Sequence, residues 1–342
     1  MSIPNILATQ INAILANFDL AILRRSQLDA LRSLSRSTAS SRPPPPLPAT
    51  ATEYLSSQNP RLRVLIENYR QALPDVMQPS RWTANYISQH VDLCNFRGDN
   101  AYVFSDKNVE STYVLTSYYM ETIDSLRLLA SLGEDGQFGA PLFEYRPGSY
   151  VSRDLLDSIV EIYSLLAHIP AQALQEGVLL DVGAGYGRFA YRLTQALPYI
   201  KRVYCTDAIP ISTFLCEYYL NWRNVDRAVA VPLPDIESIL QTGDVTIGIN
   251  IHSFSECPLA AIDWWIRLLQ EYQVRYLFIV PNPADHGGLR LLTQELDGTQ
   301  RDYSQVLTSY GYRPINISPK YNDTVIQRLG VSPTCHHYYE LS

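Results

Sequence analysis

A glycine-rich turn between an apolar run and a helical pattern constrains the fold of this chain more than any other stretch. Residues 178–180 are apolar, as in a buried parallel strand, and Asp181 follows them. Glycines then stand at positions 183, 185 and 187, before a helical pattern in Phe189, Leu193 and Leu197. Alternate glycines allow a sharp turn and let a ligand approach the backbone closely. The helix that follows offers unpaired N–H groups, so the sequence predicts a ligand-binding strand–turn–helix unit.

The spacing of these glycines separates two kinds of nucleotide-binding turn. A dinucleotide fingerprint, G-x-G-x-x-G, would need glycine at position 188, where this chain has Arg188. The carboxylate of Asp181 would repel a pyrophosphate but attract a ligand that carries an ammonium and a sulfonium group. The pattern resembles motif I of the Rossmann-like S-adenosylmethionine-dependent methyltransferases. The alternative is a glycine-rich turn that binds nothing.

Composition narrows the possible partners and compartment. The 342 residues are 46% hydrophobic and 18% charged, which predicts a largely globular chain with a sizeable core. A net charge of −7 disfavours nucleic acid as the main partner, because phosphate contacts need a basic surface. No apolar run reaches the length of a membrane span. The five cysteines show no C-x-x-C spacing, so we expect a reduced, cytoplasmic setting.

The N-terminal part divides into two predicted regions. Residues 1–48 combine an amphipathic helical pattern with a proline run at 43–46, which predicts a helix on a semi-rigid tether. Residues 1–42 could dock on another subunit, as in a homo-oligomer, or on another protein. Packing on their own domain and a mitochondrial presequence are the alternatives. Residues 49–150 are predicted to be a mostly helical cap or substrate region, with helices over 60–73 and 108–132.

Residues 151–342 alternate between apolar runs and helical patterns, which predicts an α/β domain. Ser152 is a candidate cap for the first helix. We predict a doubly wound, mostly parallel, seven-stranded Rossmann-like sheet that ends in an antiparallel C-terminal strand. The expected strands are 178–181, 203–207, 228–231, 245–251, 276–280, 312–318 and 336–341.

Ligands of open α/β sheets bind outside the carboxyl ends of the strands, near the topological switch point. Asp207 ends the second strand, where such folds place an acid for ribose hydroxyls, although it could instead cap a helix. Asp235 and Glu237 follow the third strand and could accept from an adenine amino group, or simply be solvated.

The segment after the fourth strand contains the candidate catalytic residues. His252 is the candidate general base, because an unperturbed imidazole has a pKa near ~6.5, and Glu256 is the candidate to orient it. A structural histidine is the alternative. Asp285 and His286 could contribute to an acceptor pocket, but two residues do not make a metal site, so no metal ligands are assigned.

With these stretches assembled, the chain resembles the sugar O-methyltransferase family over residues 55–340. The resemblance rests on 96–100, 181–188, 207–210 and 250–256, and the chain departs from it in having Pro210 one residue later than the family's proline. It implies S-adenosylmethionine as cofactor and a sugar or another hydroxylated small molecule as acceptor. The cofactor-binding positions would be Asp181, Gly183, Ala184, Gly185, Gly187, Arg188, Asp207, Ala208, Asp235 and Asn250.

Three functions remain open on the sequence alone. The first is a small-molecule O-methyltransferase. The second is a methyltransferase-like module that associates with proteins through residues 1–42, with weak or no catalysis. The third is a nicotinamide oxidoreductase, which Arg188 in place of the third fingerprint glycine disfavours.

Overall fold

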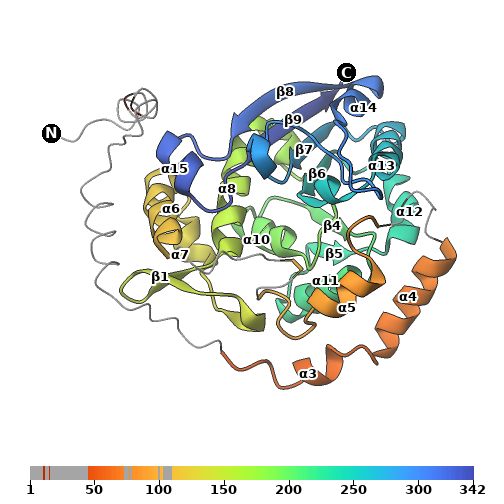
Figure 1. Cartoon of the computed structure of the whole chain (residues 1–342), viewed down its shortest axis with the longest axis horizontal. Coiled ribbons are helices and arrows are strands. Elements are labelled where there is room, and N and C mark those ends of the chain that lie inside the picture. The colour runs from red at the N-terminus through yellow and green to blue at the C-terminus, as the bar shows by residue number, and fades with distance from the viewer. Residues whose placement is uncertain are drawn as a thin grey trace.

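The computed structural model of the protein contains the predicted sheet and describes residues 11, 15, 45–72, 77, 79–98, 101–102 and 110–342 (Figure 1). The predicted helix and tether at the N-terminus fall almost entirely outside these residues. Among the described residues, no helix combines the length and the apolar character needed to cross a membrane.

Seven strands of the described chain form one sheet in the order β5-β4-β3-β6-β7-β9-β8. β3 to β7 run parallel, β9 runs antiparallel to β7, and β8 pairs antiparallel with β9 at the sheet edge. The predicted fold class is therefore confirmed. The strands are β3 (Val178–Val182), β4 (Arg202–Thr206), β5 (Ala228–Ala230), β6 (Ile247–Ile251), β7 (Tyr276–Val280), β8 (Tyr312–Pro319) and β9 (Cys335–Leu341).

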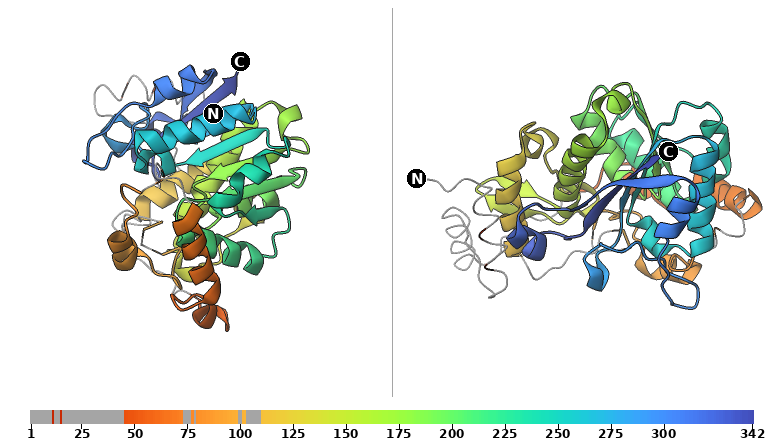
Figure 2. Two further views of the ribbon diagram at one scale, coloured as in Figure 1. Left: turned by 90° about the vertical axis from the view of Figure 1, so that its right-hand side faces the viewer. Right: turned by 90° about the horizontal axis from the view of Figure 1, so that it is seen from above.

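Helices cover both faces of the sheet, as the two turned views show (Figure 2). Successive β3 side chains enter different cores: Leu179 packs in the cluster that contains α8 and α10, and Leu180 in the one that contains α13. This alternation follows from the period of two along a strand. The longer helices from residue 150 onward are α8 (Arg153–His168), α10 (Arg188–Ala196), α11 (Pro210–Trp222) and α13 (Leu259–Glu271).

The short helical elements of this half connect the strands or precede them. They are α9 (Ala171–Leu174), η4 (Leu233–Asp235), α12 (Ile236–Leu240), η5 (Ser253–Glu256), η6 (Ala284–His286), α14 (Ser304–Ser309) and α15 (Thr324–Leu329). The predicted cap of α8 is confirmed, since the Ser152 side chain accepts a hydrogen bond from the Leu155 N–H.

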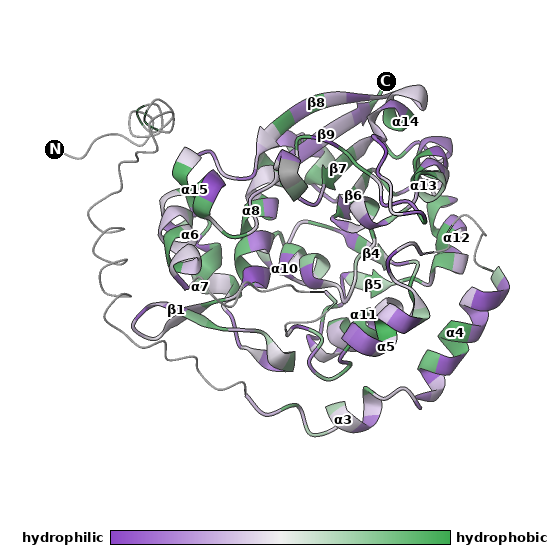
Figure 3. Ribbon diagram, viewed as in Figure 1, coloured by the Kyte–Doolittle hydropathy of each residue, from purple (hydrophilic) through white to green (hydrophobic). Residues whose placement is uncertain are grey.

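The described residues before position 150 contribute to the same cores as the sheet. Leu62, Leu65 and Tyr69 of α4 (Pro60–Ala72) pack in the same cluster as side chains of α11. α4 accordingly alternates between polar and apolar colours along its length (Figure 3). The Tyr69 hydroxyl donates to the Asp207 carbonyl oxygen at 3.0 Å, so α4 contacts the chain directly after β4.

Two details of this region differ from the sequence prediction. The prediction of a single helix over 108–132 is wrong, because the structure has two helices there, α6 (Glu110–Ile123) and α7 (Leu128–Leu132). The Asp124 carboxylate accepts from the Leu128 and Leu129 N–H groups and so caps the second helix. The region also contains a hairpin that was not predicted, β1 (Phe143–Arg146) and β2 (Ser149–Val151). Its other elements are α3 (Ala51–Tyr54), α5 (Ala84–His90) and η3 (Gln137–Gly139).

Candidate functional site

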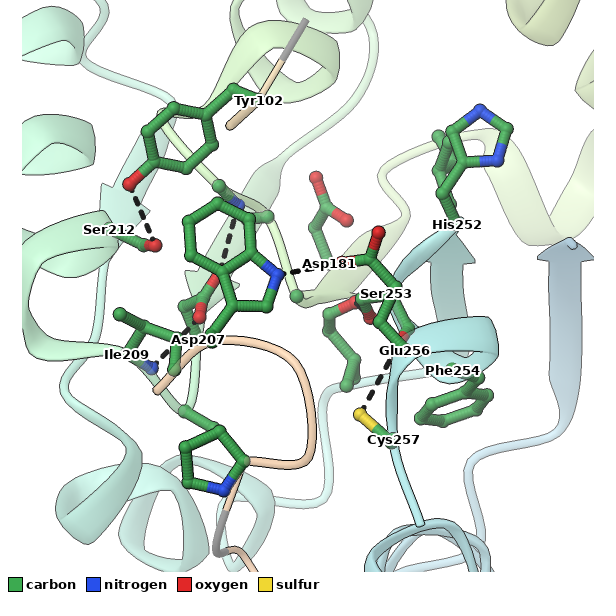
Figure 4. A pocket seen from close by; sticks show the side chains of 18 of the residues that line it. Tyr102, Asp181, Asp207, Ile209, Ser212, His252, Ser253, Phe254, Glu256 and Cys257 are labelled. Carbon is green, nitrogen blue, oxygen red and sulfur yellow. Dashed lines mark hydrogen bonds between the residues drawn. The ribbon is translucent and has the colours of Figure 1, made fainter. Parts of the chain in front are cut away.

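A pocket opens at the carboxyl ends of β3, β4 and β6, where the strand order reverses between β3 and β6. This is the place where open α/β sheets bind ligands. Its floor is the glycine-rich loop, one wall follows β4, the opposite wall follows β6, and residues from before α6 close it from above (Figure 4). The lining includes Met77, Trp82, Tyr102, Arg153, Asp181, Gly183, Ala184, Gly185, Tyr186, Arg188, Asp207, Ala208, Ile209, His252, Ser253, Phe254, Glu256 and Asn282.

The three loop glycines have positive φ angles of 75°, 56° and 85°, but they lack a side chain for different reasons. A Cβ at Gly183 would lie 2.0 Å from the Ser253 hydroxyl oxygen, and one at Gly187 would lie 2.9 Å from the Cys216 sulfur. At Gly185 the nearest atoms belong to the Tyr102 ring, at 3.4 Å. Close packing therefore requires glycine at 183 and 187, and only Gly185 presents its open side to the pocket.

Asp207 fixes the loop and presents its carboxylate beside it. One carboxylate oxygen accepts from the Gly185 N–H at 3.0 Å and the other from the Ile209 N–H at 2.9 Å. Burial raises the pKa of Asp207 to about 7, although these two hydrogen bonds lower it. Asp207 faces the pocket just before α11, but its side chain does not cap this helix, because it accepts from Ile209, the residue before the first helical turn. The contact with ribose hydroxyls stays a prediction.

Asp181 is the second buried carboxylate of the pocket. Its pKa is raised to about 7, mainly by burial, while Arg188 lowers it and the charges of Glu161 and Asp207 raise it. Arg188 itself forms a two-pronged ion pair with Glu161, at 2.8 and 3.0 Å, and donates to the Ser158 hydroxyl. The guanidinium is therefore committed to α8, and what Arg188 offers a ligand is its position at the start of α10.

Glu256 is held by the segment that closes the pocket and not by His252. Its two carboxylate oxygens accept from the Arg81 guanidinium at 2.8 Å and from the Trp82 indole N–H at 2.7 Å. In Figure 4 the His252 imidazole points away from the Glu256 carboxylate. The expected arrangement, in which Glu256 orients His252, is absent from this structure; Glu256 instead fastens the Trp82 loop over the pocket.

His252 lies at the tip of β6 in a strained backbone conformation, with φ at 69°. Its N–H continues the sheet by donating to the Val280 carbonyl oxygen at 2.7 Å. The pKa of His252 is lowered to about 3, mainly by burial and in part by the charges of Arg153, Arg188 and Lys320. The imidazole therefore stays neutral at neutral pH, and its pKa is well below the ordinary value that the sequence interpretation used.

Three other predicted cofactor residues occupy different environments. Ala208 lines the pocket next to Asp207. The Asn250 amide is used within the protein, donating to the Val182 carbonyl and the Ser253 hydroxyl and accepting from the Phe254 N–H. Asp235 is exposed at the end of η4 and is not among the described residues that line the pocket.

A buried ion network lies beneath the loop, and the sequence did not reveal it. Arg97 is fully buried and donates to both Glu134 carboxylate oxygens at 2.9 and 2.8 Å and to Asp154 at 3.0 Å. The Tyr186 hydroxyl, from within the glycine loop, donates to the same Asp154 carboxylate. Burial alone would raise the pKa of Glu134, but Arg97 and Arg192 hold it well below its usual range. Arg97 thereby ties the first half of the chain to the loop.

Replacing Arg97 with methionine is expected to lower the free energy of unfolding by about 3–5 kcal/mol, because buried Asp154 loses its cation and Glu134 loses one of its two. Urea unfolding followed by circular dichroism measures the change. Arg267→Met is the matched control: its side chain is 41% exposed, and its ion-pair partner among the described residues is Glu271 on the same helix. The control should lose no more than about 0.5 kcal/mol. A loss below about 1 kcal/mol for Arg97→Met would contradict the assigned role.

Trp82 and Tyr102 also escaped sequence analysis. Their rings lie 5.0 Å apart between centroids, and the Tyr102 hydroxyl bonds that of Ser212. They precede the glycine loop by about a hundred residues, and no periodicity marks them.

No cluster of three or more histidine, cysteine, aspartate or glutamate side chains that could hold a metal occurs in the part of the chain that the structure describes. The side chain of Asp285 lies outside that part. The Glu256 carboxylate of the pocket is bound to Arg81 and Trp82.

No protein-family model and no curated protein matches this sequence. Solved structures with a similar fold include an S-adenosylmethionine-dependent methyltransferase from Aquifex aeolicus, with 16% identity, 53% of this chain and 90% of that chain covered, and a TM-score of 0.38. Mitomycin 7-O-methyltransferase is 16% identical, with 57% of this chain and 58% of that chain covered and a TM-score of 0.39. Magnesium protoporphyrin IX methyltransferase from Synechocystis is 14% identical, with 56% of this chain and 83% of that chain covered and a TM-score of 0.39. Similarity at this level identifies neither a ligand nor a reaction, and it does not confirm the sugar acceptor.

Proposed function

We propose that the protein is an S-adenosylmethionine-dependent O-methyltransferase that acts on a hydroxylated small molecule such as a sugar. The observation that carries the proposal is that Gly185 lines one pocket with the carboxylates of Asp181 and Asp207, at the switch point of the sheet. Asp181 would attract the methionine ammonium, and Asp207 would accept from the ribose hydroxyls. Phe254 and the other apolar residues of the lining would contact the adenine.

Methyl transfer in this pocket would be an in-line displacement. The acceptor oxygen attacks the methyl carbon, the carbon–sulfur bond breaks, and the bonding pair neutralises the sulfonium to give S-adenosylhomocysteine. The hydroxyl proton must leave during the attack, and His252 is the lining residue that can take it as a neutral imidazole. This reaction needs no oxidant or further co-reactant.

The affinity for S-adenosylhomocysteine is expected to increase with pH and to level off above pH 7. Burial gives Asp181 and Asp207 pKa values of about 7, so both are largely protonated at pH 5.5. The ligand ammonium favours an ionised Asp181, and the ribose hydroxyls, as donors, favour an ionised Asp207. Below pH 7, each unit of increase in pH should lower the dissociation constant by up to about tenfold for each carboxylate. Isothermal titration between pH 5.5 and 8.5, in buffers of different ionisation enthalpy, measures the affinity and the protons released.

Asp207→Asn is the control for this pH dependence. It should bind more weakly and release fewer protons, because one titrating carboxylate is gone. An affinity that is independent of pH, or that falls as pH rises, would contradict the proposed contacts.

A second function, a methyltransferase-like interaction module with weak catalysis, is favoured by one observation. The low pKa of His252 makes it a poor proton acceptor in the empty protein. Both functions predict binding of S-adenosylhomocysteine, and turnover with an acceptor separates them. Neither predicts binding of NAD, which the same titration tests.

A further inference from the structure

A second cavity adjoins the proposed cofactor pocket and shares one wall residue with it. It has a volume of about 500 Å³, within the ~300–1,000 Å³ range of small-molecule sites. Arg153, the first residue of α8, lines both cavities. The rest of the lining comes from the start of α6 and from the end of α15 with the loop that follows it: Ser111, Thr112, Tyr113, Leu115, Arg328, Leu329, Gly330, Val331, Ser332 and Pro333.

The described lining has a distinct chemical character. It contains two arginines, several hydroxyl groups and apolar side chains, and no carboxylate occurs among the lining residues that the structure describes. Guanidinium groups pair with carboxylate and phosphate oxygens through parallel N–H donors. A small molecule that has an apolar body and carries an oxyanion would match this lining.

The walls are held in place by a buried carboxylate behind them. Asp157 accepts from the Arg153 Nε at 3.2 Å and from the Lys320 Nζ at 2.5 Å. Lys320 also donates to the carbonyl oxygens of Val331 and Ser332, at 3.0 and 3.1 Å. One carboxylate therefore positions both the shared arginine and the loop that forms the opposite wall.

We propose that this second cavity binds the acceptor of the methyl group, and that the acceptor is a small molecule whose carboxylate or phosphate pairs with Arg153 and Arg328. The inference rests on the proposed methyltransferase function and narrows its substrate class to anions. Arg153 would hold the acceptor where its hydroxyl reaches the first pocket, while Arg328, at the outer side, selects for charge.

Binding of an anion here has a consequence for His252. The charged and titratable groups that act on its imidazole are Arg153 and Asp157 of α8, Arg188 of α10, Lys320 and His336, and the three cations lower its pKa. An oxyanion against Arg153 would offset part of this positive charge. The acceptor would then raise the proton affinity of His252 at the moment when a base is needed.

The test is an isothermal titration of inorganic phosphate, and separately of acetate, into the full chain saturated with S-adenosylhomocysteine, with sodium chloride keeping the ionic strength constant. Saturable binding of one oxyanion per chain is expected, and the stronger probe indicates which group the acceptor carries. Arg328→Gln should raise the dissociation constant of the anion at least tenfold. The dissociation constant of Arg328→Lys should lie between those of the parent and Arg328→Gln. Arg313→Gln, which removes one exposed charge on β8, should leave it unchanged.

Two results would overturn the inference: no saturable binding of either anion, or binding that Arg328→Gln leaves intact. The affinity for S-adenosylhomocysteine is measured on the same samples. If S-adenosylhomocysteine does not bind, this result counts against the methyltransferase function. Titration of phosphate or acetate into the chain without S-adenosylhomocysteine would still show whether the second cavity binds an anion. The two failures are therefore distinguishable.

Discussion

Replacing Gly185 with valine is expected to abolish measurable binding of S-adenosylhomocysteine while the chain still folds. The side chain would project from the loop toward the Tyr102 ring, into the space between Asp181 and Asp207 that the ligand must occupy. The nearest atoms to the new Cβ are two carbons of the Tyr102 ring, at 3.4 and 3.7 Å, so the fold has to accommodate this contact and the strain of φ at 56°. Left-handed strain of this kind costs about 1–2 kcal/mol.

Two matched variants isolate the cause. Gly243→Val introduces the same residue at a φ of 72° with nothing within 4 Å of the new Cβ, so it should show the strain alone and bind normally. Gly183→Ala places a Cβ 2.0 Å from the Ser253 oxygen and should lower the free energy of unfolding by about 2–5 kcal/mol, the sum of strain and overpacking. Unchanged affinity of Gly185→Val for S-adenosylhomocysteine would disprove the proposed cofactor site.

Replacing His252 with alanine is expected to lower turnover by about 10²–10⁴-fold, the usual contribution of a general base. The affinity for S-adenosylhomocysteine should change little, because the imidazole is not one of its proposed contacts. Turnover is measured by transfer of a labelled methyl group to acceptors found by screening hydroxy acids and sugar acids. Turnover within a few-fold of the parent would mean that His252 is structural.

The pH profile gives His252 a second, independent test. With a pKa of about 3, the imidazole of the acceptor-free protein should contribute no loss of kcat/KM between pH 5 and 8. A bound oxyanion near Arg153 should move the corresponding loss of kcat to higher pH. A histidine titration near pH 6.5 in kcat/KM would contradict the burial and the positive surroundings described here.

The order and position of the strands could be predicted because hydrophobic pattern and turn chemistry are local. The apolar run at 178–180, the acid after it and the glycines that follow specify a strand, a tight turn and a helix without any distant contact. The C-terminal pair β8 and β9 was recognisable for the same reason. The helix over 108–132 was predicted wrongly, since the sequence pattern did not reveal that the Asp124 side chain would cap a second helix.

The roles of individual residues at the site depended on contacts between distant segments. Gly183 and Gly185 look equivalent in the sequence, yet Ser253 fills the space beside one and the pocket lies beside the other. Glu256 stands four residues from His252, but Arg81 and Trp82 bind its carboxylate.

The sequence by itself determined the α/β class, the strand order along the chain and the two carboxylates at the strand ends, because each depends on residues that are neighbours in the chain. Only the tertiary structure decided which groups face one another. Burial, with the charges of Arg153, Arg188 and Lys320, lowers the pKa of His252. Burial also raises the pKa values of Asp181 and Asp207. Desolvation and Coulomb energy depend on distances in space, which the chain fixes only when its distant segments have packed together.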